Sequence, residues 1–166
     1  MTTDYELLGS CHCQAVKFSL KSKNIYPYQL CYCSVCRKTQ GGGGFAINIS
    51  GKANTLVVSG KKNLKIYRAK IKNPEDKRKW QSTAERNFCG LCGSALWLFS
   101  PEWPELIHPF ASAIDTPLPI PPERTHCLVE FKAPWVVINK GKKDKVFKRY
   151  PKESIAEWHE RVIGIK

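Results

Sequence analysis

The stretch FCGLCGS, residues 88–94, holds two cysteines separated by two residues, and a glycine follows each cysteine. Glycines at these places permit a tight, partly left-handed turn in which backbone amides point at the sulfurs. The pattern is typical of a zinc knuckle, which presents two thiolates to one metal ion. Two thiolates are half of a tetrahedral site, so the stretch predicts that the other two ligands come from a distant part of the chain.

Cys11 and Cys13 are the natural complement, because the two side chains of a C-x-C unit leave the same face of an extended segment. A slight kink would then bring both sulfurs onto one ion with Cys89 and Cys92. A closed site of four thiolates leaves no position for a substrate, so it would be structural and would add folding free energy to a β domain. The alternative is that these four cysteines are buried and bind no metal.

A second group of cysteines, CYCSVC at residues 31–36, places three thiols in six residues. Cys31, Cys33 and Cys36 can all reach one ion, and no fourth cysteine lies nearby in the sequence. Three protein ligands with one free position are typical of a catalytic zinc, where a substrate thiol would bind as the thiolate. In the alternative, a further side chain closes this site and makes it structural; the candidates are His12, His108, His126, His159 and Cys127.

Residues next to this second group are candidates for holding a ligand. Three thiolates and Zn²⁺ sum to one negative charge, so cations such as Arg37 and Lys38 would help a further anionic ligand to bind. The glycine run that contains Gly41 and Gly42 would let the backbone approach a ligand closely. Further candidates around the predicted metal are Ser34, Gln40 and Arg86.

Length and composition are those of a globular protein: 166 residues predict one domain spanning 1–166, and 42% of them are hydrophobic. The N-terminus has no basic stretch followed by an apolar run, and no apolar window approaches the length of a membrane span, so neither a signal peptide nor a membrane partner is expected. These features favour the cytoplasm, with the nucleus as the alternative. Eight cysteines in a reducing compartment indicate metal binding or catalysis rather than disulfides.

The charge is strongly basic, with a formal net charge of +13 that two zinc ions on seven thiolates would reduce to about +10. Residues 61–79 hold nine Lys and Arg, and residues 132–152 hold eight. A basic face favours anionic partners such as a carboxylate-bearing metabolite, a nucleic acid or an acidic protein surface. The alternative is a solvated face that serves solubility.

Short runs rich in β-branched and aromatic residues predict a mainly β protein. These runs are residues 15–20, 28–33, 45–50, 55–60, 64–69, 95–100, 126–131 and 135–140. Residues 33–38 are expected to form a short helical turn. Residues 70–80 are expected to form a mobile loop, and the proline-rich residues 115–124 are expected to form an ordered loop.

One longer helix is predicted near the C-terminus, at about 151–163. Ser154 and Glu157 match a capping box, and Ile155 and Trp158 fall on one face of the helix. We expect that face to dock on the sheet. Trp103 and Trp135 are further candidates for core aromatic residues.

Four stretches together resemble one known family, the glutathione-dependent formaldehyde-activating enzymes, which include centromere protein V. They are GSCHCQAVKFSL, CYCSVCRKTQG, NFCGLCGSALW and HCLVEFKAPWVVI, and the resemblance extends from Gly9 to the last helix. It implies a β-tent fold of antiparallel sheets pinned by a zinc on Cys11, Cys13, Cys89 and Cys92. It also implies a catalytic zinc on Cys31, Cys33 and Cys36, where the founding activity joins the thiol of glutathione to formaldehyde as S-hydroxymethylglutathione. The glycine run and the longer, more basic residues 70–80 depart from the family pattern.

The sequence therefore supports a zinc-dependent enzyme of carbon–sulfur lyase type, with two zinc ions and glutathione as a possible co-substrate. It would act on a small thiol, a thiol adduct or another anionic small molecule. The competing hypothesis is a basic, zinc-stapled module that binds nucleic acid or an acidic protein, and steep salt dependence would distinguish it. No Ser-His-Asp arrangement, paired carboxylates or nucleotide-binding glycine motif supports a metal-free hydrolase or a nucleotide enzyme.

Overall fold

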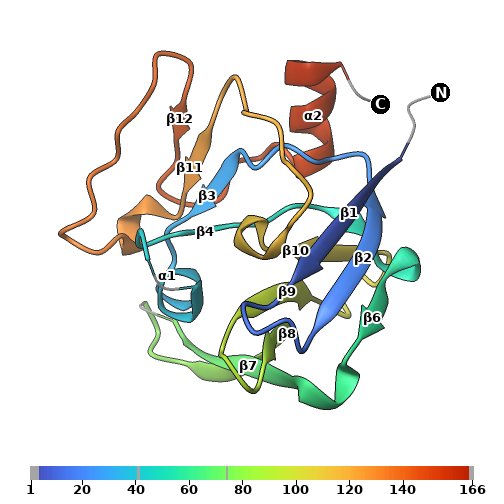
Figure 1. Cartoon of the computed structure of the whole chain (residues 1–166). Coiled ribbons are helices and arrows are strands. Elements are labelled where there is room, and N and C mark those ends of the chain that lie inside the picture. Colours follow the sequence, from blue (N-terminus) through green and yellow to red (C-terminus); the bar gives the residue numbers. More distant parts are fainter. Residues whose placement is uncertain (1–3, 41, 74, 165–166) are drawn as a thin grey trace.

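The structure is a computed structural model and describes residues 4–40, 42–73 and 75–164 (Figure 1). Two α-helices lie among short strands, and the chain is mainly β as predicted. The strands are β1 (Tyr5–Ser10), β2 (Lys17–Ser22), β3 (Gln29–Cys31), β4 (Ala46–Ile47), β5 (Gly51–Lys52), β6 (Val57–Ser59), β7 (Leu64–Lys72), β8 (Lys79–Cys89), β9 (Ala95–Phe99), β10 (Leu106–Pro109), β11 (Thr125–Cys127) and β12 (Lys145–Val146). The helices are α1 (Ser34–Gln40) and α2 (Ile155–Ile163). None of the helices in the described part of the chain has the length and apolar character needed to cross a membrane.

Two antiparallel sheets enclose the largest apolar core. One has the strand order β1-β2-β6 and the other β5-β10-β9-β8-β7. Phe18 of β2 meets Trp97 of β9 edge to face, with ring centroids 5.1 Å apart. Leu7 and Ile107 are buried in the same cluster. Burial of such side chains contributes about 1.5–3 kcal/mol each, so this contact holds the two sheets together.

The five-stranded sheet has a second face, which carries both polar and apolar side chains. Arg86 of β8 pairs with Leu98 of β9, and Leu98 pairs with His108 of β10, so these three side chains form a row across neighbouring strands. Their sequence neighbours Trp97 and Ile107 point to the opposite face and into the core, because side chains alternate along a strand. This row is part of the floor of the site described below.

The third sheet, with the order β12-β11-β3-β4, is mixed rather than antiparallel. β11 pairs in parallel with both β3 and β12, while β3 pairs with β4 antiparallel. Parallel neighbours need a long connection, and the segment from β3 to β11 contains β6 and every strand of the five-stranded sheet. The parallel register places Cys127 beside Cys31.

The last two predicted strands differ most from the structure, one by ending early and the other by being absent. Residues 126–131 continue β11 only as far as Cys127, because Leu128 adopts a left-handed conformation (φ 58°) that turns the chain away. Residues 135–140 form no strand, although Val136 is buried against Leu30 and Tyr32. The apolar content of that run reflects packing rather than strand pairing.

The prediction that residues 70–80 form a mobile loop is wrong, because the residues at both ends of this segment belong to strands. β7 extends to Lys72 and β8 begins at Lys79, so the segment is the tip of a long hairpin. The amide of Asn73 donates to the carbonyl of Arg78 at 2.8 Å, which closes the turn. β7 is an edge strand, and its many lysines discourage pairing with another chain.

The predicted C-terminal helix is present as α2, which begins at Ile155 after its cap at Ser154. The capping box is confirmed: the Ser154 hydroxyl accepts from the Glu157 amide at 3.2 Å, and the Glu157 carboxylate accepts from the Ser154 amide at 2.7 Å. Trp158 is fully buried and stacks on Tyr28 with ring centroids 3.8 Å apart. The side chain of Trp158 therefore docks the helix on the segment before β3.

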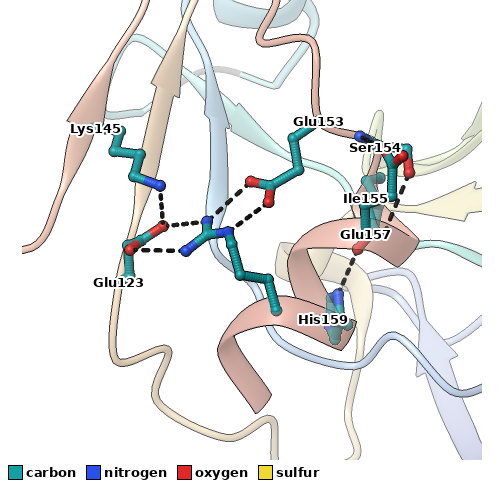
Figure 2. A network of polar contacts seen from close by, with 8 residues as sticks. Glu123, Lys145, Glu153, Ser154, Ile155, Glu157 and His159 are labelled. Carbon is teal, nitrogen blue, oxygen red and sulfur yellow. Dashed lines mark hydrogen bonds and ion pairs between the residues drawn. The ribbon is translucent and has the colours of Figure 1, made fainter. Parts of the chain in front are cut away.

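A polar network fixes the other side of α2 (Figure 2). Arg161 donates to the carboxylates of Glu123 at 2.7 Å and Glu153 at 2.6 Å, and Lys145 approaches Glu123 at 3.4 Å. The hydrogen bond from Arg161 holds the pKa of Glu123 below its usual range. The network ties the helix to β12 and to the segment before β11.

The other two predicted core tryptophans are exposed. Trp103 is 52% exposed and Trp135 is 67% exposed, so the prediction that they lie in the core is wrong. Trp103 lies in the turn between β9 and β10, and Trp135 follows Pro134 in a loop, where neither indole meets the apolar clusters.

Candidate metal centres and active-site groove

The four cysteines predicted to form one site lie together. The sulfurs of Cys11, Cys13, Cys89 and Cys92 are all within 4.8 Å of one another. Cys11 and Cys13 are 3.6 Å apart, and Cys13 and Cys89 are 3.8 Å apart. Four sulfurs at these separations suit a tetrahedral ion with thiolate ligands, so this group could hold zinc.

The knuckle at residues 89–94 has the backbone that its glycines predict. Gly93 is in the left-handed region (φ 76°), and its amide donates to the carbonyl of Cys89 at 2.8 Å. Gly90 lies against the backbone of Asn63, where a Cβ atom would come within 2.8 Å of the Lys65 side chain. The hydroxyl of Ser94 lies 3.2 Å from the sulfur of Cys92, and this hydrogen bond lowers the pKa of Cys92 to about 5.

Cys11 and Cys13 lie on the turn between β1 and β2, not in an extended segment as expected. β1 and β2 are antiparallel neighbours, so the chain between them has to reverse. The Gln14 amide donates to the Cys11 carbonyl at 3.0 Å, and Gln14 takes a positive φ of 63°. The turn brings both sulfurs to one side, and the Val16 amide donates to the sulfur of Cys11 at 3.2 Å.

The second group of cysteines also converges. The sulfurs of Cys31, Cys33 and Cys36 lie within 4.8 Å of one another at the junction of β3 and α1. The Cys36 amide donates to the sulfur of Cys33 at 3.3 Å. Hydrogen bonds from the thiols of Cys31 and Cys36 lower the pKa of Cys33, so one of the three sulfurs is readily ionised. A buried set of thiols with one thiolate is a donor set that suits zinc.

This second group opens onto a groove of about 750 Å³, whereas the four-cysteine group does not line it. The floor is the second face of the five-stranded sheet, and the β7–β8 hairpin passes beside α1 (Figure 1). The lining residues come from five parts of the fold: Gln29, Cys31, Cys33, Ser34, Val35 and Cys36 around α1; Asn48; Ala69, Lys70, Ile71, Lys72, Asn73, Glu75, Trp80, Ser82, Ala84 and Arg86 on the hairpin; Leu98, Trp103 and His108; and Phe131, Arg149, Tyr150 and Ile155. Such a volume is typical of a small-molecule site.

Arg86 connects the groove to the cysteines. One Nη nitrogen donates to the sulfur of Cys36 at 3.7 Å, and the other Nη nitrogen is buried without a hydrogen-bond partner in the described residues. The Oδ1 oxygen of Asn48 is likewise buried and unpaired, and Asn48 also lines the groove. Buried polar atoms without partners are rare. Both atoms are therefore available to a bound molecule.

His108 is a further groove residue that sequence reasoning considered only as a possible metal ligand. Its Nδ1 lies 3.2 Å from the carbonyl of Ile49. A carbonyl can only accept, so Nδ1 carries the proton and Nε2 keeps a free lone pair. Burial lowers the pKa of His108, against the opposing effect of the Ile49 carbonyl, so the ring is neutral at pH 7. The signal that could have identified it is the period-2 alternation of the LIHP strand.

The remaining predicted site residues lie in different places relative to the groove. Ser34 lines it, but Arg37 and Lys38 of α1 do not. Gly42 also lies outside the groove, and Gly41 falls outside the described residues. In the same run Gly44 takes φ 83° and lies where a Cβ atom would come within 2.4 Å of Val136. This glycine serves a close backbone contact.

Two of the residues considered as a fourth ligand lie outside the three-sulfur group. His126 hydrogen-bonds to the Tyr32 hydroxyl through Nδ1 at 2.8 Å, and its Nε2 faces Asp144 at 3.7 Å. Cys127 packs with Cys31 and Leu128 in a buried cluster. A hydrogen bond with the Cys127 thiol raises the pKa of Cys31, but the Cys127 sulfur is not part of the three-sulfur group.

The comparisons with known proteins agree with this arrangement. Residues 6–130 match the sequence model of the glutathione-dependent formaldehyde-activating enzyme family. The chain belongs to this family. The match contains all eight cysteines and most of the groove. It stops before the part of the groove wall formed by Phe131, Arg149, Tyr150 and Ile155.

Two individual proteins are similar over most of their length. A Halomonas elongata protein named "Putative glutathione-dependent formaldehyde-activating enzyme" is 56% identical over 156 residues, which are 94% of this chain and 96% of that protein. The crystal structure of a Rhodobacter sphaeroides protein aligns with a TM-score of 0.50 at 24% identity, over 68% of this chain and 91% of that one. The latter similarity supports the fold alone.

Proposed function

We propose that the chain is a zinc-dependent enzyme of carbon–sulfur lyase type. It would make or break the bond between a thiol sulfur and a one-carbon electrophile, with glutathione or a related thiol as substrate. One observation carries the proposal: three convergent thiols, from Cys31, Cys33 and Cys36, line a groove large enough for a small molecule. Membership of the family named for glutathione-dependent formaldehyde activation supports the choice of reaction.

The residues present fit two zinc ions with different roles. Cys11, Cys13, Cys89 and Cys92 provide a full set of four ligands, so a zinc there would be structural. Cys31, Cys33 and Cys36 provide three, so a zinc there would have a position for the substrate sulfur. When bound, this second zinc would lower the pKa of a substrate thiol and stabilise it as a thiolate.

Side chains of the groove supply the other requirements of the reaction. The unpaired Nη nitrogen of Arg86 can bind a substrate carboxylate, and the same guanidinium, which donates to the sulfur of Cys36, would stabilise that sulfur as a zinc-bound thiolate. Cleavage of a hydroxymethyl thioether gives a thiolate and formaldehyde and releases the hydroxyl proton. The neutral ring of His108 can accept that proton at Nε2, because its Nδ1 is occupied by the Ile49 carbonyl.

The proposal predicts that a thiol binds directly to metal at the three-cysteine site. Protein loaded with cobalt, whose thiolate complexes absorb visible light, is titrated with glutathione. We expect a saturable spectral change in the parent protein and none in Cys33→Ser. Zinc-loaded parent protein should also speed the formation of S-hydroxymethylglutathione from glutathione and formaldehyde, and Cys33→Ser should show only the spontaneous rate.

Cys127→Ser is the matched control, because Cys127 is a buried cysteine beside the site but outside the three-sulfur group. It should keep both the spectral change and the activity. Protein that carries two metals and shows no response to any thiol would contradict the proposal. A Cys127→Ser variant that gains a thiol response absent from the parent would show that Cys127 closes the site.

A further inference from the structure

The groove extends well beyond the three cysteines, whose side of the groove is called its metal end. At that end Arg86 lies 3.7 Å from the sulfur of Cys36, and Arg86 pairs with Tyr67 across the hairpin. At the other end Trp80 pairs with Ile71. Four residues of about 3.3 Å each separate Tyr67 from Ile71, so the two ends lie about 13 Å apart.

The far end of the groove holds an apolar surface beside the charged and polar residues Lys70, Lys72, Asn73 and Glu75 of the hairpin. Trp80 is 46% exposed, although tryptophan is the largest apolar side chain and normally buries most of its surface. Its neighbour Ile71 is half-buried and also lines the groove. The guanidinium of Arg78 lies over the indole, 5.7 Å from its centroid, which restrains the ring. Trp80 and Ile71 thus form a pre-ordered apolar surface facing the groove.

A second wall of the groove begins at the metal end. Phe131 packs against the cluster that contains Cys31 and Cys36, and the guanidinium of Arg149 lies over its ring at 5.1 Å. Arg149 also approaches Glu75 at the tip of the β7–β8 hairpin, at 3.9 Å. Arg149 therefore links the wall beside the cysteines to the hairpin. A ligand arm that runs from the cysteines to Trp80 would contact Phe131 at its start and the indole of Trp80 at its end.

Glutathione does not account for this far end. Its thiol lies in the middle of the molecule, and both arms end in charged groups: an ammonium and a carboxylate on the γ-glutamyl arm, and a carboxylate on the glycine arm. Neither end offers apolar surface to Trp80 and Ile71, and burial of a charged group against them would be unfavourable. The far end matches a longer and less polar group, since apolar walls favour apolar ligand surface.

We propose that the groove accepts a thiol, or its one-carbon adduct, with a long apolar arm that extends from the cysteines to Trp80 and Ile71. This inference rests on the proposed function, because it places the sulfur of that thiol at Cys31, Cys33 and Cys36. The substrate class is then a long-chain alkyl or arylalkyl thiol. Trp80 is the specificity-determining residue for the length of the arm.

The test uses cobalt-loaded full-length protein and ω-hydroxyalkanethiols of increasing length, from 2-mercaptoethanol to 11-mercaptoundecanol. Affinity should rise along the series, by up to about fourfold for each methylene that becomes buried. Trp80→Ala should weaken binding of the longest thiols about tenfold or more and leave 2-mercaptoethanol unchanged. Trp135→Ala is the matched control, because Trp135 is exposed but lies outside the groove, and it should bind the whole series like the parent.

Each outcome separates this inference from the function on which it rests. A spectral response to 2-mercaptoethanol, together with an affinity that does not change with chain length, would overturn the inference and leave the proposed function standing. The same holds if Trp80→Ala binds every thiol as the parent does. Absence of a response to all thiols would overturn the proposed function and the inference with it.

Discussion

Arg86 lies between the cysteines and the open groove, and its two Nη nitrogens have different surroundings. One is committed to the sulfur of Cys36, and the other has no partner among the described side chains. A lysine at this position would offer a single ammonium and could not bridge a sulfur and a substrate carboxylate with fixed geometry. The guanidinium fork therefore gives this residue two roles at once.

Replacing Arg86 by Met should weaken the binding of carboxylate-bearing thiols more than that of uncharged ones. A hydrogen bond to a charged group contributes about 1.5–3 kcal/mol, so glutathione should lose about 10- to 100-fold in affinity for the cobalt-loaded protein. 2-Mercaptoethanol should lose much less. Lys38→Met is the control, since Lys38 is an exposed cation of α1 outside the groove. Equal losses for both thiols would argue against carboxylate binding by Arg86.

α2 is held by a buried histidine as well as by Trp158. The Tyr26 amide donates to Nε2 of His159 at 3.1 Å, and Nδ1 of His159 lies 2.8 Å from the Ile155 carbonyl. Both nitrogens are therefore used only when the ring is neutral. Burial lowers the pKa of His159, although the Ile155 carbonyl opposes this effect.

This histidine should make the stability of the protein depend on pH. Because the pKa is lower in the folded state, the unfolded chain binds the proton more readily, and stability falls as the pH drops below the unfolded pKa of about 6.5. At about one pH unit lower, the loss from His159 is up to about 1.4 kcal/mol. His159→Gln keeps an acceptor for the Tyr26 amide but does not titrate. Its melting temperature should therefore fall less than that of the parent between about pH 7.5 and 5.5.

Thermal melts of the two proteins at several pH values measure this difference. His108 and His126 also have lowered pKa values because of burial, and metal release adds to the loss in both proteins, so only the difference between the curves reports on His159. Parallel curves for parent and variant would show that His159 does not contribute.

At the scale of the whole molecule, the two cysteine groups have different structural importance. The four-cysteine group joins the β1–β2 turn to the end of β8, which belong to different sheets. The three-cysteine group joins β3 only to the helix that directly follows it. Zinc at the first group would therefore contribute folding free energy across the main core, while zinc at the second would hold a local segment.

Thermal melts of Cys89→Ser and Cys33→Ser should differ for this reason. Structural zinc contributes on the order of 10 kcal/mol in zinc-finger peptides, so Cys89→Ser should melt far below the parent or fail to fold. Cys33→Ser should melt close to the parent. A strong chelator should lower the melting temperature of Cys33→Ser but have little further effect on Cys89→Ser. Equal melting temperatures for the two variants would contradict this division.

The basic charge follows the fold in a way that its sequence distribution does not show. Many of the cations in residues 61–79 lie on β7, the edge of the five-stranded sheet, and on the hairpin tip. In residues 132–152, Lys145 and Arg149 form ion pairs with Glu123 and Glu130. Some of these cations therefore protect the edge strand from pairing, and others are neutralised by nearby carboxylates. The basic charge from which the sequence predicted an anionic partner is explained in part by these two roles.

Short-range features of this protein could be predicted from the sequence. The knuckle with its left-handed Gly93, the convergence of Cys31, Cys33 and Cys36, and the capping box at Ser154 each depend on residues within a few positions of one another. Cys11 and Cys13 also lie within 4.8 Å of the knuckle cysteines, as expected if each pair provides two of the four ligands of one metal ion. Local backbone geometry and the number of metal ligands determine such features, and the spacing of the residues in the sequence indicates both.

The residues that line the groove could be identified only from the tertiary structure. Arg86, His108 and Trp80 lie on one floor because the register of β7 to β10 aligns residues that are far apart in the sequence. The many polar residues of β8 are also typical of a loop when the partner strands are unknown. The exposure of Trp103 and Trp135 depends on which surfaces the sheets leave uncovered. Strand pairing and burial are properties of the assembled fold, so a residue's neighbours in sequence do not determine them.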